Sequence, residues 1–342
     1  MSAVGDQSSK RQTAPAARGT CDVARGRASV RGACVLSAAL LVASPAGAES
    51  PPIGGAPKPP PFLYSVPWQL RPLPAPTVVR LDTMVGFDED RASRRGATAV
   101  SFLTLAARIP RTGPPRAGLD LVARGGFVHD KPPTGNGGNA LTNLLVGAAY
   151  AFRLPKDLLL NVFVGGLVPI GSGGGNSPDP DVVLARSRAA AVRSAFDNPT
   201  FASNDAGGTS GIGVGWVSRG WTLQLEGTIA HVVRVRGAQA QREATRTNSS
   251  FGVHVGYFLF PALSLNTELR YQRWVNPPFT VEGDPTKHTL DTVTYSVGPR
   301  FHIETAIGWL RPGVAYARAL DKPLAAAAPN LHVIQVDVPF FF

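Results

Sequence analysis

Cysteine and long apolar runs are both scarce in this sequence. The chain of 342 residues has 2 cysteines, Cys21 and Cys34, and both lie near the N-terminus. No apolar run of about 20 residues occurs beyond the N-terminal region, which excludes a bundle of membrane-spanning helices. Charged residues make up only 17% of the chain, and the basic ones are scattered rather than clustered with aromatic residues. The composition therefore gives no reason to expect a nucleic-acid partner.

The N-terminal region has the three parts of a secretory signal peptide. Arg25, Arg27 and Arg31 precede the apolar run ACVLSAALLVA, and a small-residue Ala-Gly-Ala site ends at Ala48. We predict that residues 1–48 are a signal peptide; the alternatives are a buried helix and a membrane anchor. Cleavage would remove six basic and two acidic residues, so the formal charge would fall from +11 to +7. Both cysteines would also be lost, which leaves no disulfide and no thiolate metal ligand.

Residues 49–75 are rich in proline and are predicted to be extended. The simplest interpretation is a flexible periplasmic tether. The alternative is a segment that docks in or under the following domain through Phe62, Tyr64 and Trp68.

From Thr77 onward, segments of about 10 to 14 residues alternate apolar and polar side chains, as the strands of a membrane barrel do. Leu223 and Leu225, for example, alternate with Gln224 and Glu226. About twelve such segments are present, and their length suits strands that cross a bilayer at a tilt. We therefore predict an all-β fold for residues 76–342: a transmembrane up-and-down antiparallel β-barrel of about twelve strands.

The links between these segments alternate between short and long. Short links fall at 110–116, 155–157, 218–220, 260–262 and 304–305, and long links fall near 88–95, 129–140, 171–208, 235–249, 275–289 and 319–329. This alternation is typical of an outer-membrane barrel with tight periplasmic turns and extended outer loops. Aromatic residues near both sets of links predict two membrane interfaces. The alternative is a soluble β-sandwich or small-ligand barrel, in which nothing requires one set of loops to be longer.

The chain ends on an alternating segment, LHVIQVDVPFFF. We expect it to pair with the first strand and close the barrel, because no unpaired backbone group can face hydrocarbon. Phe340 and Phe342 would face lipid and would resemble the signal that the barrel assembly machinery of Gram-negative bacteria recognises. The expected location is the cell outer membrane, and the expected partners are outer-membrane lipid and lipopolysaccharide, the barrel assembly machinery and small solutes.

Strand parity places eleven charged side chains on the inner face of the barrel. These predicted pore-lining residues are Arg80, Asp82, Asp120, Arg124, Glu226, Arg234, Glu268, Arg270, Arg300, Arg311 and Asp337. Two interpretations fit the mixture of charges. The groups form paired networks that hold the interior together, or they line a water-filled pathway whose basic excess favours anions.

The third long link is predicted to contain a short helix. Asp179 can cap it with Pro180 in the first position, and the Asn198-Pro199 pair ends it. In one hypothesis the helix enters the barrel mouth and narrows a pore that prefers anions. In the other it packs on the rim as a surface helix. The arginines of the predicted constriction helix are Arg186, Arg188 and Arg193.

No catalytic constellation is visible in the sequence. Of the six histidines, only His231 and His332 fall on the outward face, where barrel hydrolases place theirs, and neither has an obvious serine and polar partner. No two histidines have the spacing of metal ligands. We therefore predict no enzymatic activity, no metal and no cofactor.

Residues 163–180, FVGGLVPIGSGGGNSPDP, join a strand to a glycine-rich loop through a Pro-Ile-Gly strand end. This stretch is similar to the strand end of the phenol-degradation MetA-type outer-membrane proteins, a set of transporter-like barrels. Residues 66–72 and 193–205 resemble stretches of uncharacterised proteobacterial barrels. The resemblance implies passive transport or a porin-like role, and it carries over no catalytic residue.

The predicted function is that of an outer-membrane porin-like channel for passive passage of small solutes, with a weak preference for anions or organic acids. The alternative is a non-conducting structural or surface-interaction barrel with a plugged lumen.

Overall fold

The computed structural model describes residues 63–90, 92–114, 117–193, 197–237, 244–277, 279–282, 290–320 and 331–342. Within those ranges the chain is mostly strand, with short helices α1 (Pro180–Val192), α2 (Asn198–Phe201) and α3 (Phe279–Glu282). No helix of this part is both long and apolar enough to cross a membrane. The predicted signal peptide and Phe62 lie outside the described residues.

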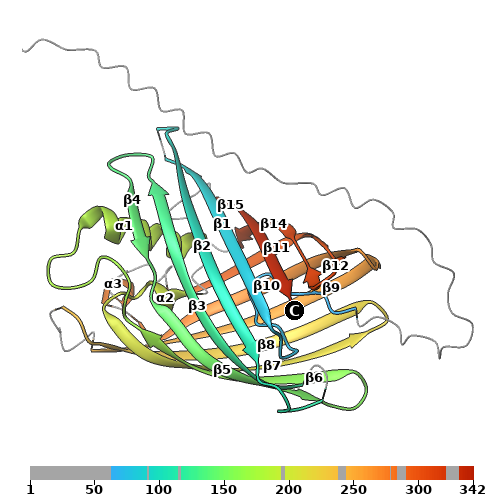
Figure 1. Cartoon of the computed structure of the whole chain (residues 1–342). Coiled ribbons are helices and arrows are strands. Elements are labelled where there is room, and N and C mark those ends of the chain that lie inside the picture. The colour runs from blue at the N-terminus through green and yellow to red at the C-terminus, as the bar shows by residue number, and fades with distance from the viewer. Residues whose placement is uncertain are drawn as a thin grey trace, which may run out of the picture. The chain divides into compact units, whose positions relative to one another are not determined.

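Twelve antiparallel strands form a closed barrel (Figure 1). In wall order they are β1 (Val78–Glu89), β2 (Arg95–Arg108), β3 (Gly118–Lys131), β5 (Leu144–Arg153), β6 (Leu158–Val168), β7 (Asp205–Ser218), β8 (Trp221–Arg234), β9 (Thr245–Phe260), β10 (Leu263–Asn276), β11 (Asp291–Phe301), β14 (Gly313–Ala319) and β15 (His332–Phe341). Each strand pairs with its neighbour in this order, and β15 pairs with β1. The predicted up-and-down barrel is therefore confirmed.

Three short strands supplement the wall. β4 (Gly138–Leu141) pairs with β3 beyond the part of β3 that pairs with β5. β12 (Ile303–Thr305) and β13 (Gly308–Leu310) form a hairpin between β11 and β14, and β13 also pairs with the end of β15. This hairpin stands where the sequence predicts only a short turn, at residues 304–305.

The wall strands expose apolar side chains and bury polar ones. On β8, Leu223 and Leu225 are 42% and 44% exposed, whereas Gln224 and Glu226 are 1% and 4% exposed. A soluble sandwich or barrel buries its apolar face, so this inverted arrangement requires hydrocarbon around the barrel. Because successive side chains of a strand point to opposite faces, the alternation of apolar and polar residues gives the barrel a lipid-facing exterior and a polar interior.

The two ends of the barrel differ in their connections. The tight turns at 154–157, 219–220 and 261–262 share one end with the first residues of β1 and the last of β15. We call this the short-turn end. The opposite, long-loop end carries the segment 169–204, which contains α1 and α2 and which we call the loop insert.

One predicted long link is wrong. Strands β1 and β2 extend until only residues 90–94 lie between them, so the link expected near 88–95 is a tight hairpin. The Asp90 carboxylate closes it by accepting hydrogen bonds from the backbone N–H groups of Ala92 and Arg94, both at 2.9 Å. An aspartate that bonds to the following backbone in this way is a standard turn former.

The final residues complete the closure at the short-turn end. The β1–β15 register runs from Val78 opposite Phe341 to Phe87 opposite His332. Beyond it, the Phe342 N–H donates to the carbonyl oxygen of Thr77 at 3.0 Å. A barrel closed in this way presents no unpaired edge to lipid.

Candidate solute pathway

The segment that precedes the first strand lies inside the barrel. Residues 63–77, which we call the N-terminal plug, bury every side chain from Tyr64 to Leu70. Tyr64, Val66, Trp68 and Leu70 are all at most 3% exposed. Their contacts come from lumen-facing residues on strands around the wall. The expectation of a flexible tether is therefore wrong for residues 63–75, and the alternative of docking through Tyr64 and Trp68 describes what the structure contains.

Two lumen carboxylates hold the backbone of the N-terminal plug. Glu268 accepts hydrogen bonds from the N–H groups of Trp68 at 2.8 Å and Gln69 at 3.1 Å. Glu226 accepts the Arg71 N–H at 2.8 Å and also the Arg71 guanidinium at 2.7 Å. An extended segment that joins no sheet needs partners for its backbone groups, and these carboxylates supply them.

A second network ties the plug to the closing strands. Arg80 and Arg300 both bind the Asp337 carboxylate, at 2.8 Å and 2.5 Å. The Arg300 guanidinium also lies 4.4 Å from the Trp68 ring centroid, within the range of a cation–π contact. Arg311 donates to the Tyr64 carbonyl oxygen at 3.0 Å. These arginines therefore have fixed partners and do not stand free in the lumen.

Helix α1 begins where the sequence predicts it. Asp179 is its N-cap, the Asp179 carboxylate accepts the Asp181 N–H at 2.9 Å, and Pro180 occupies the first turn. Alanine-rich composition favours helix in the following residues. The helix ends earlier than expected, at Val192, and the Asn198-Pro199 pair begins α2 instead. A proline fits the first turn of a helix, which is why this pair starts one.

Helix α1 packs against the inner face of the wall and not on the rim. Its buried residues Ala185, Ala189 and Val192 join one apolar cluster with lumen-facing side chains such as Met84 and Phe102. Gly86 on β1 permits this approach, because a Cβ atom there would overlap Val192 Cγ2. The loop insert therefore occupies the long-loop half of the lumen.

The arginines of the predicted constriction helix all have partners within the described residues. Arg188 binds Asp88 at 2.6 Å and Asp130 at 2.8 Å. Arg193 binds Asp82 at 2.6 Å and Asp197 at 2.8 Å. Arg186 donates to the carbonyl oxygens of Gly173 and Phe201 and to the Ser203 hydroxyl. Their charges are therefore largely used to hold the loop insert in place.

Asp197 joins the loop insert to the wall. It binds Arg193 of the insert and Arg124 of β3, the latter at 2.8 Å. Burial acts to raise the pKa of Asp197, but the guanidinium groups of Arg124 and Arg193 outweigh it and lower the pKa below the usual range for aspartate. The group is therefore a carboxylate at neutral pH.

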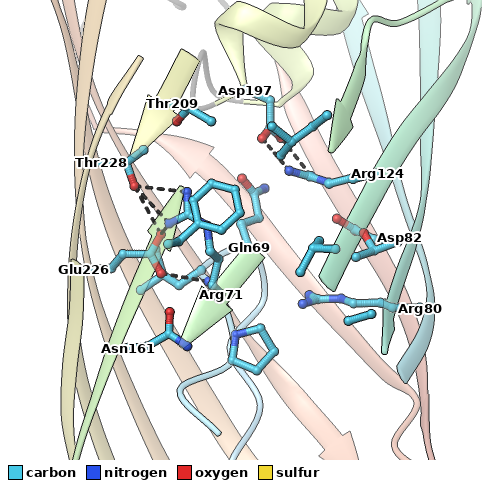
Figure 2. Close-up of a pocket in the computed structure, with 18 of the residues that line it drawn as sticks. Gln69, Arg71, Arg80, Asp82, Arg124, Asn161, Asp197, Thr209, Glu226 and Thr228 are labelled. Carbon is cyan, nitrogen blue, oxygen red and sulfur yellow. Dashed lines mark hydrogen bonds and ion pairs between the residues drawn. The ribbon is translucent and has the colours of Figure 1, made fainter. Parts of the chain in front are cut away.

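A cavity remains between the plug, the wall and the loop insert (Figure 2). Its volume is about 140 Å³. It reaches Val78 and Phe341 beside the short-turn end, and Pro199 and Thr200 of α2 border it toward the long-loop end. Figure 2 shows Arg71 bound to Glu226 and Thr228 on one side of this space and Arg124 bound to Asp197 on the other.

The predicted pore-lining residues lie on the inner side of the barrel. Those that border the cavity are Arg80, Asp82, Asp120, Arg124 and Glu226. The remaining six, Arg234, Glu268, Arg270, Arg300, Arg311 and Asp337, lie elsewhere in the interior, and Arg234 has its Nε 3.9 Å from an Asp205 oxygen. Whether these residues line a conducting pore stays a prediction.

Sequence reasoning did not single out the plug residues Gln69 and Arg71 or the insert residue Asp197, which also border the cavity. The alternation of Tyr64, Val66, Trp68 and Leu70 was the available signal for the plug, since it predicts one buried face. No comparable local signal marks Asp197, because its partners come from β3 and from the end of α1.

The structure brings together one serine–histidine pair that strand parity did not reveal. Ser264 Oγ lies 2.9 Å from His302 Nε2, and the two residues are 0% and 6% exposed. No carboxylate orients His302 among the hydrogen bonds of the described residues, and catalytic serine–histidine pairs need such a third group. Within the described ranges there is also no group of three or more His, Cys, Asp or Glu residues able to hold a metal ion.

No protein-family model matches the chain, and neither does any curated protein. Several solved structures do match the chain. A crystal structure of an outer-membrane channel from Pseudomonas putida F1 matches with a TM-score of 0.51 and 12% identity over 82% of this chain and 100% of the other. The KdgM porin in complex with disordered oligogalacturonate (TM-score 0.43, 10% identity, 77% and 99% covered) and the NanC porin (0.45, 9%, 76% and 98%) are also similar.

These likenesses concern the fold. The closed barrel, its apolar exterior and the similarity to a channel structure agree that the chain has an outer-membrane β-barrel fold. Barrels with an even strand number and a lipid-facing surface reside in the outer membrane, with short turns toward the periplasm. No family model supports the more specific resemblance to MetA-type proteins.

Proposed function

We propose that the protein is a porin-like channel that lets small solutes cross the outer membrane passively. The observation that carries this proposal is the cavity that borders the plug on one side and the lumen wall on the other, from Val78 and Phe341 to Pro199 and Thr200. Solutes would follow this off-axis route past the plug, and the loop insert would control its outer end. The similarity of the fold to the outer-membrane channel from Pseudomonas putida F1 supports the same class of function.

The sequence-based expectation of a weak preference for anions or organic acids rested on a basic excess in the lumen. In the structure Arg186, Arg188 and Arg193 are engaged with carboxylates or carbonyl oxygens. The same holds for Arg71 and Arg124 at the cavity. We therefore propose a channel for small solutes without a strong preference for anions.

One observation favours a second candidate, a non-conducting barrel with a structural or surface-interaction role. The plug and the loop insert together fill much of the lumen, and both are held by buried ion pairs and hydrogen bonds. Buried pairs of this kind are costly to break one partner at a time. In this alternative neither segment would move.

Reconstitution separates the two candidates. The purified full chain is inserted into planar bilayers for single-channel recording and into liposomes for swelling in sugars, organic acids and aromatic solutes. Discrete conductance and swelling support the channel, and a KCl gradient should give a reversal potential without strong anion selectivity. A correctly folded barrel that passes neither ions nor solutes would leave the non-conducting role.

A further inference from the structure

Asp120 is a buried carboxylate in apolar surroundings. It lies near the start of β3, borders the cavity and is only 3% exposed. Ala149 lies opposite it on β5, and Ala106 and Val122 border the same part of the cavity. Burying a charge among apolar side chains costs free energy unless a partner compensates it.

Each of the other carboxylates at the cavity has a guanidinium partner. These pairs are Asp82 with Arg193 at 2.6 Å, Asp197 with Arg124 at 2.8 Å, and Glu226 with Arg71 at 2.7 Å. Asp120 differs: within the described ranges it makes no ion pair, and its Oδ1 has no hydrogen-bond partner. Buried polar atoms without a partner are uncommon in native proteins, so this one calls for an explanation.

Two arginines stand beside Asp120 but are held elsewhere. Arg108 is its register partner on β2, yet the Arg108 guanidinium donates to the carbonyl oxygens of Gly113 at 3.0 Å and Pro114 at 2.8 Å. Arg124, on the same face of β3, is bound to Asp197. The described part of the chain therefore supplies no counter-charge to Asp120.

We propose that the cavity binds a small organic cation, with its protonated amine at Asp120 and its apolar body along Leu145, Ala149 and Phe163. The ammonium group would donate to Asp120 Oδ1, and a hydrogen bond between two charged groups is stronger than a neutral one. The three apolar side chains border the same cavity from β5 and β6. A mostly apolar wall with one well-placed charged group is the usual construction of a small-molecule site.

This inference rests on the proposed function and deepens it by naming a class of solute. Benzylammonium, benzyl alcohol and benzoate are suitable probes, because they share a ring and a similar size but differ in charge. Binding of each is measured by isothermal titration to the purified full chain in detergent micelles. We expect benzylammonium to bind at least about tenfold more tightly than the other two probes, a difference of about 1.4 kcal/mol.

Substitutions assign the binding to this cavity. Asp120→Asn keeps the shape of the side chain and should weaken benzylammonium binding at least about tenfold. Asp157→Asn is the matched control, because Asp157 lies in an exposed turn with φ 61°, a conformation that asparagine tolerates. This variant should bind benzylammonium as the wild-type chain does. Benzylammonium also partitions into the detergent micelles, but it does so equally in the Asp120→Asn and Asp157→Asn samples. This contribution therefore cancels when the two variants are compared. Ala149→Leu, which fills the cavity without changing charge, should also weaken binding.

Two results overturn the inference. One is binding of benzoate or benzyl alcohol as tight as that of benzylammonium to the wild-type chain. The other is wild-type affinity for benzylammonium in folded Asp120→Asn or Ala149→Leu protein. Binding is measured without transport, so failure of this inference is distinct from failure of the proposed channel. A conducting barrel that does not bind benzylammonium rejects only this inference. A non-conducting barrel that binds benzylammonium rejects only the proposed passage of solutes.

Discussion

Arg193 links the loop insert to the wall through charge. Its side chain is 0% exposed, and it binds Asp82 of β1 and Asp197 of the insert. Removing one member of a buried ion pair leaves the others uncompensated and typically costs about 3–5 kcal/mol. The position of the insert therefore depends on this residue as well as on the apolar face of α1.

Arg193→Met should loosen the loop insert while leaving the barrel intact. Methionine retains much of the arginine volume, but Asp82 and Asp197 lose a shared partner. We expect faster proteolysis within residues 177–199 and larger or more frequent channel openings. Arg95→Met is the control, since Arg95 has an 87% exposed side chain in a surface pair that contributes little. Equal proteolysis of the two variants would contradict the role of Arg193.

The lowered pKa of Asp197 leads to a prediction of how the loop insert responds to pH. A carboxyl group whose pKa is lower in the folded state stabilises the fold above its ordinary pKa of about 3.9. That stabilisation is lost only as the pH falls further, through the lowered pKa of Asp197. Single-channel records should therefore show no loosening of the insert between about pH 8 and about pH 5. Openings that increase steeply within that range would show that another group controls the insert.

The two elements inside the lumen are held in different ways. Helix α1 presents small apolar residues, Ala185 and Ala189, to the wall and is fixed at its end by Arg193. The N-terminal plug has no regular structure and is fixed through its backbone by Glu226 and Glu268. A helix satisfies its own backbone groups, whereas an extended segment takes acceptors from its surroundings. Interior carboxylates on β8 and β10 therefore have a structural use.

Removing most of the loop insert should widen the pathway. Pro199 and Thr200 border the cavity at its outer end, so a deletion of residues 177–199 should raise single-channel conductance. Unchanged conductance in a folded deletion variant would discard the insert as a constriction.

A reversible lock offers a complementary test without deletion. A Cβ at Gly86 would lie 3.4 Å from Val192 Cβ, close to the separation found in disulfides, about 3.5–4.5 Å. Oxidised Gly86→Cys/Val192→Cys protein should show fewer openings, and a reductant should restore them. The predicted mature chain has no cysteine of its own to interfere. Single-cysteine variants serve as controls. Channel openings that are equally frequent in the oxidised and the reduced double variant would show that α1 need not move.

Closure of the whole barrel depends on the last strand. β15 pairs with β1 along the whole length of β15, and Phe342 continues the contact to Thr77. Phe340 and Phe342 also meet edge to face, with ring centroids 4.7 Å apart, and Phe342 is 64% exposed. An exposed aromatic ring packed against a half-buried one at the lipid interface suits both anchoring and recognition by assembly machinery.

Phe342→Ala should lower the yield of assembled barrel in the outer membrane. The substitution leaves the backbone bond to Thr77 possible, so a loss would reflect the aromatic side chain. The measurement is the fraction of chain that shows heat-modifiable mobility on gels. Phe301→Ala is the control, because Phe301 is an exposed aromatic at the same end of the barrel with 51% exposure. Equal yields from both variants would remove Phe342 from the proposed assembly signal.

Sequence reasoning located the inward-facing charged residues but not their partners. Asp82 and Arg124 are assigned to the lumen by strand parity, and the structure agrees in direction. Their neighbours Asp197 and Arg193 come from a loop that lies 73 residues from Arg124 and 111 residues from Asp82 in sequence. Parity is a local property of one strand and contains no information about such a distant segment.

The sequence by itself determined the barrel. Alternating segments, a closing aromatic strand and mostly correct link lengths follow from local patterns, because lipid outside and polar groups inside impose a period of two on every wall strand. Only the tertiary structure decided what occupies the lumen. The plug, the loop insert and the solitary carboxylate of Asp120 depend on which distant segments meet within the cylinder, and that outcome is set by packing and charge pairing across the whole chain.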